Sequence, residues 1–193
     1  SLPSRGLGDV YKRQAINIAE KISTLLKDKT LIIDVTTHNQ NGSIKMEQIF
    51  SKQKINYIEC PVMGGPAQAE EGVCGGIVGA SEENFKKSEV YLKTFCKDYF
   101  HFGEVGKGAK SKLLNNFLSL GTATNVIEFI KSAKKLDIDL EKLFAVAKLG
   151  SGNSTALNRI FDNVLKDDYT GFKFSTSNTV SYTHLRAHET EEN

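Results

Sequence analysis

The sequence has too little of several features that would place it in a specialised class of protein. Lysine and arginine total 25 against 23 acidic residues, so the net charge of the 193-residue chain is only +2. That balance gives no reason to expect a nucleic-acid or membrane-surface partner. No apolar run approaches the roughly 20 residues of a membrane helix, and the N-terminus does not resemble a secretory signal. We therefore expect a cytoplasmic protein with no nucleic-acid and no membrane partner.

Cysteine is scarce as well. The three cysteines, Cys60, Cys74 and Cys96, are far apart in the sequence and odd in number, and their spacing matches neither a zinc site nor a disulfide framework. A reduced compartment is the simplest interpretation, with no bound metal. We expect Cys74 and Cys96 to be small core residues rather than nucleophiles, because neither has a recognisable catalytic partner nearby in the sequence.

The two ends of the chain share an unusual relation at the level of DNA. DVYKRQ, at 9–14, can be encoded by a string whose reverse complement, in another frame, encodes the first residues of VSYTHL, at 180–185. This relation is expected of a sequencing adapter that was translated at both ends. We therefore predict that residues 1–14 and 180–193 are adapter artefacts, which are excluded from reasoning about the fold.

Hydrophobic periodicity divides the remainder into two parts. Short β-branched runs alternate with amphipathic segments up to about residue 104, as in a parallel sheet covered by helices. The expected strands cover 30–37, 55–62, the GGIV run and an edge strand at 99–103, and the expected helices cover 15–26, 43–53 and Ser81 to about Cys96. We predict an α/β, Rossmann-type domain over 15–104, present only in part.

The second part, 105–179, is predicted to be a truncated all-helical domain. Residues 110–136 are apolar on nearly every side and contain no proline, which indicates a long helix buried by neighbours or by a second subunit. Asp139 can cap a following helix that ends at Gly150, and Ser154 can open a third. The chain is thus expected to be α/β followed by all-α.

The segment HFGEVGKGAKSKLLNNFL, at 101–118, contains the most informative polar residues. Three glycines are expected to form a flexible entrance to the long helix, and Lys112 and Asn116 then lie four residues apart, on one helix face. Burial disfavours the charged form of a lysine, so Lys112 could deliver or accept a proton. The spacing alone favours a solvated lysine beside polar helix residues.

A second segment, IECPVMGGPAQAEEGVCGGIVGA at 58–80, ends a strand in a glycine pair. Bare backbone N–H groups there would lie at the carboxyl edge of a sheet, where α/β proteins bind ligands. A plain glycine turn is the alternative. Considered together, 59–80 and 103–116 resemble the β-hydroxyacid dehydrogenase family, which includes 3-hydroxyisobutyrate dehydrogenases and tartronate-semialdehyde reductases.

The resemblance extends over essentially all of 15–179 and rests on two motifs. The family pattern D-x-P-V-S-G-G followed by A-E-x-G is similar to Glu59 through Ala80, and G-x-x-G-x-G-x-x-x-K-x-x-N-N is matched by Gly103 through Asn116. The Asn-Asn ending distinguishes the chain from the related 6-phosphogluconate dehydrogenases. The resemblance implies an oxidoreductase that transfers a hydride between NAD or NADP and a small hydroxy acid, and a homo-oligomer formed through the helical domain.

The resemblance also assigns roles to individual residues. It implies that Lys112 is the catalytic acid/base and that Asn116 is its amide partner in substrate binding. It places the substrate-binding loop at Met63, Gly64 and Gly65. It places the residue that contacts the cofactor near its nicotinamide at Thr37.

Departures from the family pattern leave alternatives open. Met63 stands where the family has a serine, so a reductase of a semialdehyde or an imine remains possible, as does a non-catalytic helical dimerisation module. The sequence lacks the glycine-rich dinucleotide fingerprint and the acidic or basic residue that selects NAD or NADP at the ribose, so both cofactors are expected as alternatives. His38 is expected to be a loop residue with solvated nitrogens.

Overall fold

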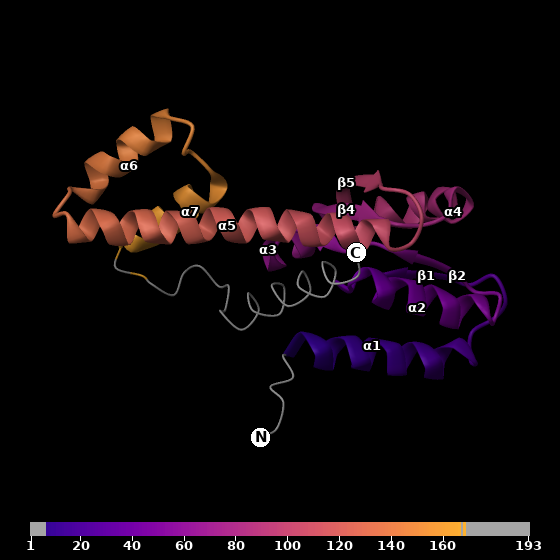
Figure 1. Cartoon of the computed structure of the whole chain (residues 1–193). Coiled ribbons are helices and arrows are strands. Elements are labelled where there is room, and N and C mark those ends of the chain that lie inside the picture. Colours follow the sequence, from indigo (N-terminus) through magenta and orange to yellow (C-terminus); the bar gives the residue numbers. More distant parts are fainter. Residues whose placement is uncertain (1–6, 167, 169–193) are drawn as a thin grey trace, which may run out of the picture. The chain divides into compact units, whose positions relative to one another are not determined.

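The structure is a computed structural model that describes residues 7–166 and 168, with side chains from residue 14 onward (Figure 1). The chain divides into two compact units between Leu114 and Asn115, and each is described by itself. The division lies within helix α5 (Lys107–Lys135), so this helix contributes to both units.

The first unit begins its sheet with the predicted parallel pair. β1 (Leu31–Asp34) and β2 (Asn56–Glu59) are joined by α2 (Gln40–Ser51), with Leu31 opposite Asn56 and Asp34 opposite Glu59. Because parallel strands need a crossover connection, the strand–helix–strand order in the sequence was sufficient to predict this pairing. Both strands therefore end at the same edge, at Asp34 and Glu59.

The predicted strand over 55–62 is in fact two strands. Pro61 has no backbone N–H and separates β2 from β3 (Val62–Met63). β3 pairs antiparallel with β4 (Cys74–Val78), and β4 pairs parallel with β5 (Cys96–His101), which is an edge strand as expected. An antiparallel bridge between Glu59 and Gly79 links the two sheets.

Besides α2 and the beginning of α5, three helices of the described chain accompany these strands. α1 (Leu7–Ser23) begins before the predicted 15–26 and ends earlier, and α4 (Glu82–Leu92) is capped by the Ser81 hydroxyl as predicted. The five-residue α3 (Pro66–Glu70) was not predicted. Two apolar clusters lie against the strands, one around Phe50 and Tyr57 and the other around Ile58 and Val78.

The second unit is helical, as predicted. α6 (Leu140–Leu149) and α7 (Thr155–Val164) follow α5, and Asp139 and Ser154 are their N-caps. Their core is formed by Val126 and Ile130 of α5 together with buried residues of α6 and α7. None of the described helices is both long enough and apolar enough to cross a membrane.

The prediction that the long helix is buried by neighbours or by a second subunit is not confirmed by the described chain alone. α5 exists and is 29 residues long, but Leu118 is 67% exposed and Ile127 is 46% exposed. Within the second unit α6 and α7 cover only the side of α5 that carries Ala123, Val126 and Ile130. An apolar pattern all round a helix thus predicted more burial than two neighbouring helices can supply.

Candidate functional site

Lys112 is a buried lysine with an unusual pair of neighbours. Its side chain lies in the first turns of α5, and the residue is only 8% exposed. Its Nζ donates a hydrogen bond to the Val62 carbonyl oxygen over 2.7 Å and lies 3.1 Å from the Met63 sulfur. Burial lowers the pKa of Lys112 from its ordinary value. The structure therefore joins two of the predicted site segments, and the solvated-lysine alternative is wrong.

The beginning of α5 is held by a buried carboxylate. Glu59 Oε1 accepts hydrogen bonds from the backbone N–H groups of Gly106, over 2.6 Å, and Gly108, over 2.8 Å. Unpaired N–H groups and the helix dipole favour an anion at this end of a helix. This contact ties the end of β2 to the helix that carries Lys112.

The glycines before Lys112 are thus not the flexible entrance that was predicted. Gly106 is buried and has a φ of +99°, a left-handed conformation that side chains rarely adopt. A Cβ on Gly108 would lie 3.0 Å from Glu59 Oε1 and 2.9 Å from the backbone nitrogen of Gly79. A Cβ on Gly79 would overlap the Glu59 carboxylate itself. The motif glycines make room for a buried carboxylate.

Replacing Glu59 by glutamine is expected to flatten the dependence of stability on pH. Burial raises the pKa of the Glu59 carboxyl, and its hydrogen bonds offset only part of that increase. Between the ordinary pKa of glutamate and this raised value, the folded chain binds more protons than the unfolded chain. Its free energy of unfolding therefore falls as the pH rises through this window. A glutamine side-chain carbonyl keeps an acceptor for both N–H groups and does not titrate.

Urea unfolding of the two chains from about pH 4 to about pH 7 tests this expectation. Besides burial, the Glu59 charge also helps to raise the pKa of Glu47, so glutamine at position 59 flattens the pH dependence through both groups. The wild-type chain should lose stability relative to Glu59→Gln as the pH rises. Parallel curves would contradict the assignment of a raised pKa to Glu59.

The predicted substrate loop is formed, with one correction. Met63 ends β3, and Gly64 follows with a φ of +130°. The backbone N–H of Gly65 is not bare as predicted, because it donates to the Gln68 side-chain oxygen over 2.8 Å. Gln68 lies in α3 and is exposed, so a ligand oxygen could displace it.

The two remaining predicted site residues are Asn116, in the same helix as Lys112, and Thr37, in the loop after β1. Asn116 follows Lys112 by four residues in α5, and its side-chain nitrogen is buried without a hydrogen-bond partner among the described residues. Thr37 lies in the loop after β1 and is half-buried. An unsatisfied buried amide is costly unless a ligand or water completes it.

The sequence did not predict a cluster of polar side chains at the end of β1. His38 is fully buried rather than solvated, because its Nε2 lies 3.0 Å from Asp34 Oδ2, and the Tyr57 hydroxyl donates to the same oxygen over 2.9 Å. Burial raises the pKa of Asp34, but the hydrogen bonds and the charge interaction with His38 have the larger combined effect. The pKa of Asp34 is therefore lower than its ordinary value. The four-residue spacing of Asp34 and His38 was visible in the sequence, but the contribution of Tyr57 from another strand was not.

The cysteines are expected to be unreactive in the folded chain. All three are free and buried, and burial raises the pKa of Cys60 to about 12. The thiolate is the reactive form, so labelling by a disulfide reagent should be slow in buffer and rapid in denaturant. Immediate labelling of the native chain would show that these residues are not core residues.

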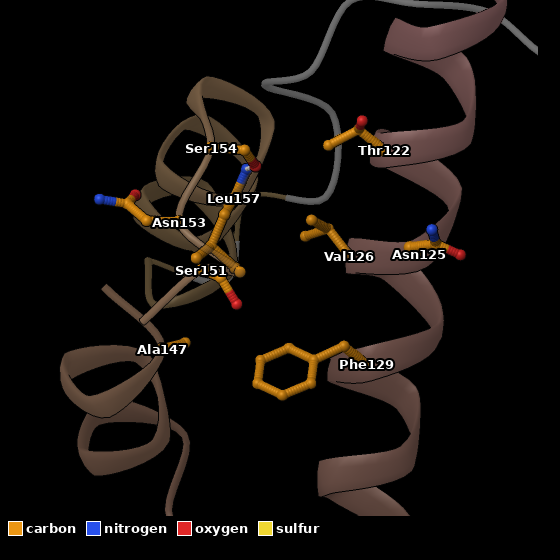
Figure 2. A pocket seen from close by; sticks show the side chains of 10 residues that line it. Thr122, Asn125, Val126, Phe129, Ala147, Ser151, Asn153, Ser154 and Leu157 are labelled. Atoms are coloured by element: carbon orange, nitrogen blue, oxygen red, sulfur yellow. Dashed lines mark hydrogen bonds between the residues drawn. The ribbon is translucent and has the colours of Figure 1, made fainter. Parts of the chain in front are cut away.

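The second unit contains a cavity of about 550 Å³ (Figure 2). Thr122, Val126 and Phe129 line it from α5, and the 151–154 loop lines it from the other side. None of the predicted site residues lines this cavity. Within the described residues no group of histidine, cysteine, aspartate or glutamate side chains could hold a metal ion.

Two protein-family models match the chain. The NAD-binding domain of 6-phosphogluconate dehydrogenase matches residues 10–103, and the NAD-binding domain of NADP-dependent 3-hydroxyisobutyrate dehydrogenase matches residues 106–178. Among curated proteins, 2-(hydroxymethyl)glutarate dehydrogenase of Eubacterium barkeri is 27% identical over 172 residues, which are 89% of this chain and 56% of that protein. A probable mitochondrial 3-hydroxyisobutyrate dehydrogenase of Dictyostelium discoideum is 30% identical over 63% of this chain and 38% of that protein.

The chain thus spans about half the length of the curated relatives it matches. Among solved structures, 3-hydroxyisobutyrate dehydrogenase of Mycobacterium tuberculosis with L-serine has the same fold, with a TM-score of 0.69 at 16% identity over 95% of this chain and 72% of that one. An imine reductase of Myxococcus stipitatus with NADP+ has a TM-score of 0.63 at 21% identity, over 89% of this chain and 63% of that one. The two family models together extend over nearly the whole chain, and it belongs to the β-hydroxyacid dehydrogenase family of NAD(P)-dependent oxidoreductases.

Proposed function

We propose that the protein containing this chain oxidises a small, 3-hydroxyisobutyrate-like β-hydroxy acid with NAD or NADP, or reduces the corresponding carbonyl compound. The observation that carries this proposal is the buried Lys112, whose amine is bound to the Val62 carbonyl at the beginning of the predicted substrate loop. The amine lies beside Met63, which directly precedes the glycine pair that the family uses for its substrate. Burial lowers its pKa, which favours the neutral amine that can accept a proton.

In the oxidation, Lys112 in its neutral form accepts the proton of the substrate hydroxyl. The carbon–hydrogen bond of the alcohol breaks with both electrons, and the cofactor, when bound, supplies the acceptor for this hydride. In the reverse direction Lys112 returns the proton to the carbonyl oxygen. The Val62 carbonyl keeps Nζ at a fixed place, so the amine needs no reorganisation before the transfer.

The remaining site residues would hold the two ligands. The unpartnered side-chain nitrogen of Asn116 can donate to a substrate oxygen, and Gly64 and Gly65 allow a carboxylate to approach the backbone. The loop at the carboxyl end of β1 has the position where α/β sheets bind cofactors, so Thr37 would contact the nicotinamide end. The unpartnered Asn116 side chain and the loop after β1 therefore suit a hydroxy-acid substrate and a nicotinamide cofactor, respectively. The sequence has no glycine fingerprint for the rest of the dinucleotide.

The organisation of the whole protein is part of the proposal. Residues 15–104 would complete their Rossmann-type domain with sequence not present here, 105–179 would form most of the helical domain, and 1–14 and 180–193 would be adapter. Exposed apolar side chains of α5, such as Leu118 and Ile127, support a homo-oligomer formed through that domain. A cytoplasmic location stays a prediction.

One observation favours a second candidate, a reductase of a semialdehyde or an imine. The Met63 sulfur lies 3.1 Å from Lys112 Nζ, where the family serine would offer a hydroxyl. A thioether is a weak acceptor and cannot donate to a carboxylate, so a carboxylate that depends on this position would bind less well.

The experiment is a substrate survey with the protein expressed from the uninterrupted coding sequence. Formation of reduced nicotinamide is followed spectroscopically with small β-hydroxy acids, and its consumption with semialdehydes and cyclic imines, with NAD and NADP in turn. Turnover of hydroxy acids supports the first candidate, and turnover of imines or semialdehydes alone supports the second. Binding of neither cofactor would favour a non-catalytic helical module.

A further inference from the structure

The loop after β1 is held by a buried polar cluster that the reaction itself does not use. Asp34 Oδ2 receives hydrogen bonds from His38 Nε2, over 3.0 Å, and from the Tyr57 hydroxyl, over 2.9 Å. Asp34 Oδ1 receives the backbone N–H of Thr36, over 2.9 Å. A carboxylate can only accept, which assigns the Nε2 proton of His38 to this contact. One carboxylate therefore connects β1, β2 and the loop between β1 and α2.

These contacts hold the backbone on both sides of Thr37. Thr36 is bound through its N–H and His38 through its ring. The next residue, Asn39, caps α2 by accepting the N–H of Gly42 over 2.9 Å. Hydrogen bonds thus fix residues before and after the threonine that the proposed function places at the nicotinamide.

We propose that Asp34, His38 and Tyr57 form a positioning cluster that fixes the Thr36–Thr37 backbone for binding of the nicotinamide cofactor. The inference rests on the proposed function. His38 is a positioning residue rather than a catalytic one, because it is 0% exposed and cannot touch a substrate. The described residues also offer no metal-binding group that would account for the cluster.

Stability alone does not explain this arrangement. Removing a carboxylate, an imidazole and a phenol hydroxyl from water is costly, and apolar side chains of similar volume would fill the same space without that cost. Asp34 remains ionised in the fold, so its hydrogen bonds are charge-assisted and geometrically selective. Such a network specifies the position of a loop more sharply than apolar packing does.

The first test measures hydrogen exchange of the Thr36 amide in the chain described here. Tyr57→Phe removes only a hydroxyl, and His38→Leu removes the ring donor, while His38→Gln keeps a donor. Exchange should be faster by about tenfold or more in Tyr57→Phe and His38→Leu, the effect of losing one charge-assisted hydrogen bond. His38→Gln should recover part of the protection.

The matched control is His101→Gln. His101 Nε2 lies 2.7 Å from the Ala80 carbonyl oxygen and is partly buried, but it belongs to β5 rather than to the β1 loop. Its replacement should leave exchange at Thr36 unchanged. If Tyr57→Phe also leaves this exchange unchanged in a folded chain, the cluster does not fix the loop and the inference is wrong.

The second test measures the dissociation constant of NAD and NADP for the protein from the uninterrupted coding sequence. Tyr57→Phe and His38→Leu should weaken binding by about tenfold, the size of the effect that loss of one charge-assisted hydrogen bond has on an equilibrium. His38→Gln should restore binding in part, and His101→Gln should not weaken it. Equal dissociation constants in folded variants would overturn the inference, whereas a wild-type protein that binds neither cofactor would overturn the proposed function instead.

Discussion

Replacing Lys112 by alanine in the enzyme is expected to lower kcat by about 10²–10⁴-fold, the contribution typical of a positioned acid/base group. The Nζ lies 2.7 Å from the Val62 carbonyl oxygen and beside Met63 of the predicted substrate loop, and alanine leaves no titrating group there. Lys112→Arg should be similarly impaired, because a guanidinium keeps its proton at any working pH. The dissociation constant of the cofactor should change little, since the predicted nicotinamide contact, Thr37, lies after β1.

Lys107→Ala is the matched control. Lys107 is an exposed lysine at the beginning of the same helix, so its loss removes an equal charge from α5 without touching the loop. Its kcat should remain within a few-fold of the wild type, as expected for surface substitutions. If Lys107→Ala and Lys112→Ala have the same activity, Lys112 has no role in proton transfer.

Replacing Gly79 by alanine is expected to destabilise the first unit by about 3 kcal/mol, at the upper end of the cost of overpacking a core. The new Cβ would overlap the Glu59 carboxylate, which is buried and held by Gly106 and Gly108. The carboxylate cannot move without giving up these hydrogen bonds. The free energy of unfolding, from urea titration, measures the effect.

Gly121→Ala provides the contrast within the same chain. Gly121 lies inside α5, and no other part of the described chain comes within 4 Å of the place that a Cβ would take. Alanine there should stabilise the helix by about 0.5–1 kcal/mol. Gly79→Ala should cost less in a Glu59→Asp chain than in the wild-type chain, because the shorter carboxylate no longer occupies the place of the new methyl group. Equal effects of the two alanine substitutions would show that Glu59 does not occupy the space beside Gly79.

Local patterns predicted much of this fold. Caps such as Asp139 and Ser154 act within a few residues, so their helix starts were visible in the sequence. The parallel pairing of β1 and β2 followed from strand–helix–strand order. The half-exposed side of α5 could not be predicted, because the residues that cover a helix come from elsewhere in the chain.

In the candidate site, too, the sequence predicted features that depend on neighbouring residues and missed contacts between residues far apart in the chain. The motif around Lys112 predicted a functional lysine, and its burial beside Met63 is consistent with that prediction. The anchoring of α5 by Glu59 was not predicted, because the partners are 47 and 49 residues apart in the sequence. Likewise the prediction of a solvated His38 was wrong, since the ring is fully buried and its Nε2 is bound to Asp34.

The central claim is that the buried Lys112 transfers the substrate proton. The most direct measurement is the rate of hydride transfer as a function of pH, in the wild-type enzyme and in Lys112→Ala. Burial lowers the pKa of Lys112, so the wild-type oxidation rate should rise with pH through a group that titrates below an ordinary lysine, and this titration should be absent from Lys112→Ala. The same titration in both proteins would contradict the account.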